Sequence, residues 1–347
     1  MAPKYAKDQP AGFMNRIERV AIVGAGGSIG KPIAQELLKT GLHTVTALTR
    51  SSSVNPLPEG IKSVEVDYDS EQSLVNALRG QQFLIITLAV TAPPDTEGKL
   101  IRAAAAAGVP YVMPNAYGWD VTNESMARDI PIPGHGGFKE VCESVSKDGQ
   151  GQGQGLAWIA LVCGFWYEFS LVNGVEWFGF DFANKKVTFY NDGNTTINVS
   201  TWEQCGRAVA GLLSLKELPE DEDDQAPSVS AWRNKPVYMD SFAVSQRDMF
   251  ESWKRVTGDK DSEWTVEYEG SEERWARGCE LLKGGDRKGL AMAMYARVFF
   301  ENGDGNYGER NGLQNEVLGL LVEDLDERTR VARGMLERGY SYFGNRV

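Results

Sequence analysis

Glycines gather at one point near the start of the chain, where a short apolar segment gives way to an amphipathic one. Gly24, Gly27 and Gly30 are spaced as GxxGxxG. A strand that turns sharply into a helix while its backbone approaches a pyrophosphate leaves no room for a Cβ atom. The helix start also offers unpaired N–H groups to a phosphate, and Ser28 can add a hydroxyl. The predicted phosphate loop consists of Gly24, Ala25, Gly26, Gly27, Ser28, Ile29 and Gly30.

The second predicted strand ends in a basic side chain. In an NAD site the corresponding position, some 20 residues past the glycines, is an Asp or Glu that holds the ribose hydroxyls. This chain has Arg50 there, between Thr49 and Ser51. A guanidinium can bind a 2′-phosphate through two hydrogen bonds, with hydroxyls in support, so NADPH is the predicted cofactor. The alternative is that Arg50 is a solvated residue at a strand end. Asp67 and Tyr68, after the third predicted strand, are expected to flank the adenine.

The elements that position these residues alternate from residue 19 to about 165. Short apolar, β-branched runs are separated by amphipathic stretches, a pattern typical of β-α-β units. The predicted strands are RVAIV, TVTALT, SVEVD, FLIITLAV, VPYVMP and LAWIALV. Ile29, Ile33 and Leu37 recur every fourth residue and define one helical face. Ser70, and either Ser200 or Thr201, are placed to cap two later helices.

This pattern predicts an α/β fold with a Rossmann-type doubly wound parallel sheet over residues 1–165, whose first 17 residues are expected to be flexible. Beyond residue 166 the alternation gives way to aromatics, turns and helices. We therefore expect a smaller mixed α/β substrate domain over residues 166–347, with some segments returning to the sheet. A chain of 347 residues is long enough for two such domains.

Composition limits the partners. A net charge of −12 and a pI near 4.9 disfavour nucleic acid. The N-terminal stretch lacks the apolar core of a signal peptide, and no segment approaches 18 uninterrupted apolar residues, so we expect a cytoplasmic protein without membrane contact. The four cysteines have neither CxxC spacing nor a companion histidine cluster, so no metal is predicted. A small-molecule substrate is expected, and a homodimer is left open.

Four stretches together resemble the NmrA-like and isoflavone-reductase-like branch of the atypical short-chain dehydrogenases. They are the glycine loop, Arg50 after the second strand, the segment VMPNAYG, and the segment WIALVCGFWYEFSLV. The similarity is best over residues 18–215, and the later motifs look most like fungal members. The resemblance implies a seven-strand parallel Rossmann sheet, NADPH, and a substrate cleft between the sheet edge and a small C-terminal domain.

The resemblance also implies roles for single residues. Reductases of this family use a lysine on the helix after the fifth strand, and Lys139 in GHGGFKEVCES stands at the matching position. There it would contact the nicotinamide ribose and assist proton transfer; the alternative is an ordinary surface lysine. Asn115, Gly164 and Phe165 match positions near the nicotinamide, and Ala89, in the fourth predicted strand, is expected to be a further cofactor contact.

The segment PNAYG departs from the family pattern. Ala116 replaces an acid that many relatives carry, which puts in doubt any proton relay through that acid. Tyr117 keeps an aromatic ring with a hydroxyl and is a candidate catalytic residue. His135 lies four residues before Lys139 and is a further candidate, with a loop histidine without catalytic duty as its alternative.

An aromatic run follows the sixth predicted strand. Its members are Trp166, Tyr167, Trp177, Phe178, Phe180 and Phe182. Some are expected in the domain core, and part of the run is a candidate apolar wall for a flat substrate. The predicted function is an NADPH-dependent reductase of a carbonyl or conjugated double bond in an apolar or aromatic small molecule. Secondary metabolism is a pathway class that would supply such a substrate. The alternative is a non-catalytic NAD(P)-binding sensor of the NmrA type.

Overall fold

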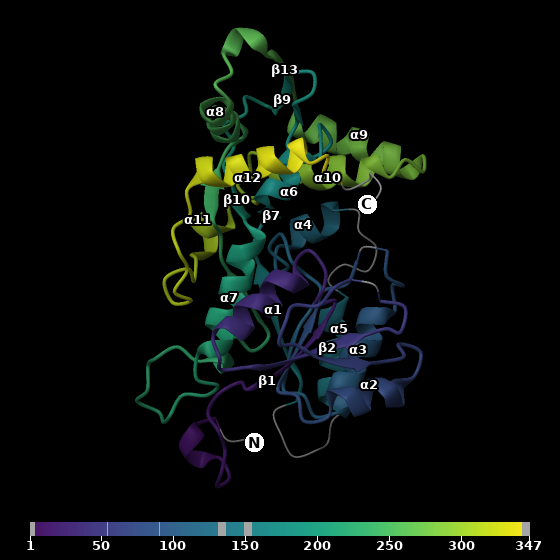
Figure 1. The fold of residues 1–347 in the computed structure, drawn as a ribbon, viewed down its shortest axis with the longest axis vertical. Helices are drawn as coiled ribbons and strands as arrows, with labels where there is room; N and C mark the ends of the chain where they lie inside the picture. The colour runs from purple at the N-terminus through teal and green to yellow at the C-terminus, as the bar shows by residue number, and fades with distance from the viewer. Residues whose placement is uncertain (1–3, 54, 90, 131–136, 149–154, 342–347) are drawn as a thin grey trace.

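The computed structural model describes residues 4–53, 55–89, 91–130, 137–148 and 155–341. The molecule is elongated (Figure 1). A parallel sheet with its helices fills the part that contains the N-terminus, and smaller sheets and helices fill the other end. The short helix α4 lies between the two parts.

The main sheet has seven strands in the order β11-β6-β5-β4-β1-β2-β3, and every pairing in it is parallel. This confirms the predicted Rossmann-type sheet. Its central strands are apolar along their whole length because helices cover both faces. The strands are β1 (Arg19–Val23), β2 (Thr44–Thr49), β3 (Lys62–Glu65), β4 (Phe83–Ile86), β5 (Tyr111–Met113), β6 (Ala157–Val162) and β11 (Lys235–Tyr238).

Two helices cover one face of this sheet and three cover the other. The first face is packed by α1 (Gly30–Lys39) and α7 (Trp202–Ser214), which run side by side. The opposite face is packed by α2 (Glu71–Leu78), α3 (Thr96–Ala106) and α5 (Phe138–Asp148). The predicted caps are confirmed: Ser70 accepts from Ser73 N, and of the two candidates it is Thr201 that accepts from Gln204 N.

The remaining elements build a second, largely aromatic core around two three-stranded sheets, β12-β10-β7 and β13-β9-β8. Their strands are β7 (Phe165–Trp166), β8 (Phe180–Asp181), β9 (Lys186–Tyr190), β10 (Ile197–Ser200), β12 (Phe242–Val244) and β13 (Thr265–Glu269). The helices are α4 (Glu124–Asp129), α6 (Tyr167–Val172), α8 (Gln246–Thr257), α9 (Ser271–Lys283), α10 (Lys288–Val298), α11 (Tyr307–Asn311) and α12 (Leu325–Glu337). Three 3-10 helices span Ala6–Asp8, Val229–Trp232 and Asp261–Glu263. Among the described residues, none of the helices combines the length and the apolar character that crossing a bilayer requires.

Candidate functional site

The glycine loop connects β1 to α1 at the carboxyl edge of the sheet. Gly24 has φ +80°, and a Cβ atom there would come within 2.0 Å of Thr87 O. A Cβ atom at Gly30 would meet Gly24 O at 2.2 Å and Thr87 Oγ1 at 2.6 Å. Thr87, at the end of β4, is itself fixed by donating to Val23 O at 2.7 Å. These two glycines are therefore required by backbone packing between β1, α1 and β4.

The start of α1 suits an anion. Ile29 is the N-cap residue, and no side chain caps the helix there. The first N–H groups of a helix have no intrahelical partner and attract negative charge. Ser28 is exposed beside them, within hydroxyl reach of a ligand at the helix start. Gly26 has another reason to be glycine, because its Cβ atom would lie 2.9 Å from Asn55 Cβ, where the β2–β3 connection covers the loop.

The expected adenosine residues line one open pocket of about 820 Å³ after β2 and β3. Arg50, Ser51, Asp67 and Tyr68 all border it. Thr49 stands behind them, with its Oγ1 3.2 Å from Ser63 Oγ. The Arg50 guanidinium lies 6.0 Å from the centre of the Tyr68 ring, and burial raises the pKa of Tyr68 while the Arg50 charge lowers it. The residues that the sequence analysis assigned to the adenosine end therefore share one pocket in the structure.

The two cationic side chains that line this pocket, Arg50 and Lys99, differ in whether they are paired with carboxylates. Lys99, on α3, also lines it, but its Nζ lies 2.8 Å from both Asp69 and Asp95. Arg50, in contrast, has no carboxylate at ion-pair distance among the residues that the structure describes. Glu65 and Asp67 add further negative charge to the pocket wall. Arg50 is therefore the guanidinium best placed to meet a phosphate at this end.

Asn115 links the carboxyl ends of β4 and β5, at the centre of the carboxyl edge of the main sheet. Its Oδ1 accepts from Leu88 N at 2.9 Å, and its Nδ2 donates to Leu88 O at 3.2 Å. Its backbone N donates to Glu97 Oε1 at 2.7 Å. Ala89, next to Leu88, is exposed. Burial raises the pKa of Glu97, and the hydrogen bond from Asn115 lowers it.

Glu97 is a site residue that the sequence reasoning missed. It lies in the first turn of α3, some 18 residues before Asn115 along the chain, and it brings a half-buried carboxylate to the segment where Ala116 lacks one. The sequence signal was a glutamate at a helix start, which also fits an ordinary favourable charge on the helix dipole. Thr87 was missed for a similar reason, since its contact with Gly24 appears only in three dimensions.

Tyr117 turns its hydroxyl into the protein, on the α1 and α7 side of the sheet. Its Oη is buried and has no hydrogen-bond partner in the described part of the chain. Burial raises the pKa of Tyr117 well above its ordinary value, and the neighbouring Cys163, Glu97 and Cys205 raise it further. The phenol therefore stays protonated at any physiological pH. It can serve as a hydrogen-bond donor.

Lys139 lies in the first turn of α5. Its Nζ donates to Val121 O at 2.5 Å and lies 5.8 Å from the centre of the Trp158 ring. These contacts place it above the α3 and α5 face of the sheet, and in the described part of the chain neither of them is with Asn115 or the glycine loop. Its role at the nicotinamide stays a prediction. The candidate His135 lies outside the described residues.

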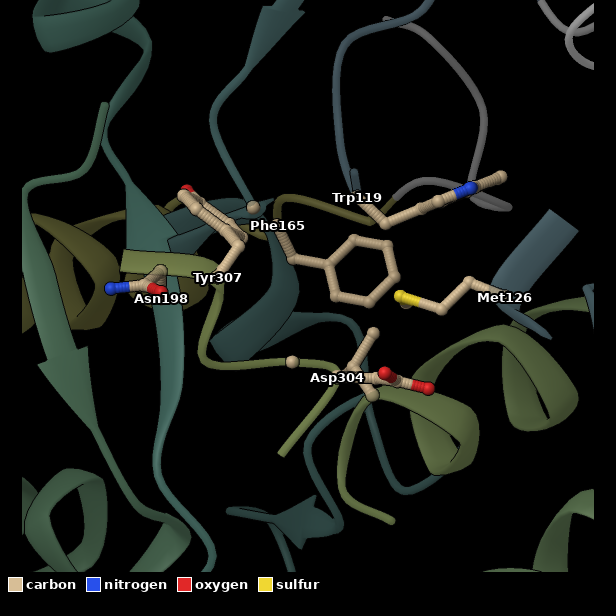
Figure 2. A pocket seen from close by; sticks show the side chains of 9 residues that line it. Trp119, Met126, Phe165, Asn198, Asp304 and Tyr307 are labelled. Atoms are coloured by element: carbon tan, nitrogen blue, oxygen red, sulfur yellow. The ribbon is translucent and has the colours of Figure 1, made fainter. Parts of the chain in front are cut away.

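Gly164 and Phe165 follow β6. Gly164 has φ +64°, and its Cβ atom would lie 2.0 Å from Asn198 O of β10. Glycine is therefore required where the chain that leaves β6 passes β10. The Phe165 ring stacks on Tyr295 with centroids 3.9 Å apart. Figure 2 shows Phe165 between Trp119, Met126 and Tyr307, with Asp304 to one side. The cavity they enclose measures about 10 Å³, room for roughly one water molecule.

Most of the aromatic run that follows β6 lies in the second core, and Trp166 lies where the two cores meet. Trp177, Phe178 and Phe180 are buried in the second core, and Phe182 stacks on Trp253 with centroids 3.7 Å apart. These residues therefore form packing rather than an open wall. Trp166 is half-buried and packs against the core of the main sheet, and its ring centroid lies 5.8 Å from that of Phe169, which packs against the second core.

The residues present fit a dinucleotide. A glycine turn that a Cβ atom would fill, an uncapped helix start, and a pocket with Arg50 lie along the carboxyl edge of one parallel sheet. Ligands of open α/β sheets bind at this edge. Fold and site define an NAD(P)H-binding protein of the Rossmann class.

Comparison with known proteins agrees with this class. Residues 24–133 match the model of an NAD(P)H-binding family. The chain is 29% identical over 310 residues to "Oxidoreductase aprR" of Aspergillus flavus, which covers 89% of this chain and 96% of that protein. Its fold is similar to that of an isoflavone reductase, with a TM-score of 0.67 and 17% identity over 91% of this chain and 99% of the other. It is equally similar to AtPrR2 with NADP+ and (+)-pinoresinol, with a TM-score of 0.69 and 18% identity over 92% and 100% of the two chains.

These similarities support the resemblance to the NmrA-like and isoflavone-reductase-like proteins that the motifs indicated, and the fold is that of an isoflavone reductase. The match to the family model ends at residue 133, and the fungal relative and the solved structures extend the similarity through the C-terminal part.

Proposed function

We propose that this protein is an NADPH-dependent reductase of a carbonyl group or conjugated double bond in an apolar or aromatic small molecule. The observation that carries the proposal is the carboxyl edge of the sheet, where a glycine turn, an uncapped helix start and the Arg50 pocket fit a dinucleotide. Tyr117, two residues from Asn115 at this edge, is a protonated candidate donor. The names of the relatives support the same chemistry, because the fungal relative is called an oxidoreductase and one structure of similar fold is an isoflavone reductase.

NADPH, when bound, would supply the hydride. The glycine loop would hold the pyrophosphate, Arg50 the 2′-phosphate, and Asn115 the nicotinamide end. Because its pKa is raised, Tyr117 would keep its proton and donate a hydrogen bond to the substrate oxygen as that oxygen gains negative charge. Lys139 would deliver the proton, and Tyr117 or His135 would do so if Lys139 does not.

A non-catalytic NADPH sensor is the second candidate. Two observations favour it: Ala116 stands where many relatives have an acid, and the enclosed cavity beside Phe165 is far too small for a substrate. For a sensor, cofactor binding would alter the surface offered to a protein partner rather than start a reaction.

NADPH oxidation by the purified protein, tested against quinones, enones and aromatic ketones, separates the two. For a reductase, Tyr117→Phe and Lys139→Ala should each lower turnover by about a hundredfold, the usual contribution of a positioned acid or donor, while NADPH affinity changes little. Wild-type protein that binds NADPH but reduces no member of the panel would support the sensor. A Lys139→Ala variant with full turnover would remove Lys139 from the mechanism without removing the activity.

A further inference from the structure

One segment between β5 and α5 leaves the main sheet and contacts the part of the molecule that carries the smaller sheets, here called the second part. This junction segment comprises residues 119–130 and contains the helix α4, which lies between the two parts (Figure 1). Within it, the carbonyl oxygen of Val121 accepts a hydrogen bond from Lys139 Nζ at 2.5 Å. Whatever fixes the junction segment therefore fixes the acceptor that orients the predicted proton donor.

The carboxylate of Asp304 joins the junction segment to the second part. From the junction segment, Asn123 Nδ2 donates to Oδ1 at 2.7 Å, and Ser125 Oγ donates to Oδ2 at 2.8 Å. From the second part, Arg297 Nη2 donates to Oδ2 and Arg310 Nη1 donates to Oδ1, both at 2.6 Å. Asp304, Asn123 and Arg297 are buried. Each oxygen of one buried carboxylate thus binds both the junction segment and the second part.

Arg297 also binds the junction segment directly. Its Nε donates to Asp129 Oδ2 at 2.8 Å, at the end of α4, and its Nη2 donates to Ser125 Oγ at 3.0 Å. Burial alone would raise the pKa of Asp304, but hydrogen bonds from Arg297, Asn123 and Ser125 lower it to about 2. The carboxylate is therefore charged at physiological pH. Removal of one member of a buried ion pair leaves the other charge uncompensated, so this network resists movement of the junction segment.

A second buried acid fixes the junction segment on the other side of Val121. Asp120 Oδ1 accepts from Thr122 N at 2.8 Å and thereby closes a tight turn around Val121. The same carboxylate accepts from Tyr238 Oη of β11 at 3.2 Å and from Asn311 Nδ2 of α11 at 3.1 Å. Val121 is therefore held from both sides. A lysine amine has three donor hydrogens, so a bond to the Val121 carbonyl leaves the others for a ligand.

We propose that Asp304 and Arg297 are positioning residues for Lys139, on which they act through the junction segment and the Val121 carbonyl. This rests on the proposed reductase function, in which Lys139 delivers the proton. The second part of the molecule thereby sets the direction of an amine that belongs to the nucleotide-binding part. Loss of a bond between Asp304 and the junction segment lets the Val121 carbonyl move and releases the amine.

Two variants each remove one hydrogen bond to the same atom, Asp304 Oδ2. Ser125→Ala removes a donor that belongs to the junction segment, and Asn302→Ala removes a donor at 3.0 Å that belongs to the second part. The rate of Lys139 acetylation by N-hydroxysuccinimidyl acetate is measured by mass spectrometry after digestion. We expect about threefold faster acetylation in Ser125→Ala, because the amine leaves the Val121 carbonyl more often, and an unchanged rate in Asn302→Ala.

Asp304→Asn is the stronger perturbation, and Asp326→Asn is its control for lost stability. Hydrogen bonds from Arg255 and Ser252 lower the pKa of Asp326 to about 2, and both of these donors lie on α8. A carboxyl group with a lowered pKa stabilises the folded protein at neutral pH, so both variants should lower Tm in thermal melts. Only Asp304→Asn should also accelerate Lys139 acetylation, by about tenfold.

The acetylation rates can refute the positioning role in two ways. Equal rates in wild type, Ser125→Ala and Asp304→Asn would show that the network does not hold the amine. Equal increases in both members of a pair, Ser125→Ala with Asn302→Ala or Asp304→Asn with Asp326→Asn, would show general loosening of the fold instead.

Turnover separates this inference from the proposed function. With a substrate that wild type reduces, Ser125→Ala should lower kcat about threefold and leave KM and NADPH affinity unchanged, because only the direction of the proton donor is disturbed. Faster acetylation with full turnover keeps the positioning of the amine and removes Lys139 as the proton donor. If wild type reduces no substrate, the reductase function fails, and the acetylation rates still decide whether Asp304 orients Lys139.

Discussion

Replacement of Arg50 by glutamine tests the cofactor assignment most directly. Arg50 lines the pocket after β2 together with Ser51, and no carboxylate lies at ion-pair distance from it in the described structure. Its guanidinium is therefore available to a 2′-phosphate. NADPH carries this phosphate and NADH does not, so the ratio of the two affinities isolates the contribution of Arg50.

The structure limits the size of this contribution. A hydrogen bond to a charged group contributes about 1.5–3 kcal/mol. Arg50 is exposed, and Glu65, Asp67 and Asp69 share the pocket wall, so a phosphate is also repelled there. We therefore expect a contribution just below this range, about 1.4 kcal/mol, which is a tenfold preference of the wild type for NADPH.

Titration calorimetry with each cofactor gives the four affinities. Arg50→Gln should weaken NADPH binding about tenfold, leave NADH binding unchanged and remove the preference. Higher salt should shrink the wild-type preference, because exposed charges are screened over about 8 Å at physiological ionic strength. Lys99→Gln is the control, since Lys99 lines the same pocket but is already paired with Asp69 and Asp95. Equal NADPH and NADH affinities in wild type, or a larger loss from Lys99→Gln than from Arg50→Gln, would refute this reasoning.

Three further predictions concern the glycine loop and two buried acids. Gly30→Ala should reduce NADPH affinity at least a hundredfold by calorimetry, because the new methyl would meet backbone oxygen at 2.2 Å. Glu97→Gln keeps an acceptor for the Asn115 N–H and should retain NADPH affinity in the same titration, whereas Glu97→Ala should lose about tenfold in NADPH affinity. If both variants bind NADPH as tightly as each other, Glu97 does not position Asn115 for the cofactor. Burial raises the pKa of Glu168 to about 7, despite the opposing charge of Arg328, so this group favours folding at low pH and the benefit is lost as pH rises from 4.5 through 7. Glu168→Gln should flatten the pH dependence of Tm over that window in thermal melts, and an unchanged slope would contradict the shift.

The sheet was predictable because its evidence is local. Each strand is a short apolar run, and the helix face formed by Ile33 and Leu37 repeats with the helical period, so both appear in the sequence without knowledge of the rest of the fold. Arg50 and Tyr68 were placed together because the carboxyl ends of adjacent parallel strands meet at one edge. The topology rule supplied this long-range contact.

The residues that were missed depend on contacts between distant segments. Glu97 reaches Asn115, which follows β5, from the first turn of α3, and Trp202 in the first turn of α7 contacts Trp166 across 36 positions. No spacing rule distinguishes these side chains from ordinary helix-start residues. The aromatic run shows the converse difficulty: Phe178 and Phe180 belong to the core, but a core and a ligand wall use the same residue types.

The position of β11 in the sheet affects how the chain folds during synthesis. The strand pairs with β6 although more than 70 residues separate them, and α7 lies in that interval. Ile159 and Leu161 of β6 face the core that α7 completes. A nascent chain released from the ribosome up to β6 therefore exposes this face, and it stays uncovered until about 50 more residues have emerged. Folding from the N-terminus therefore cannot complete the seven-stranded sheet until β11, which ends at Tyr238, has left the ribosome.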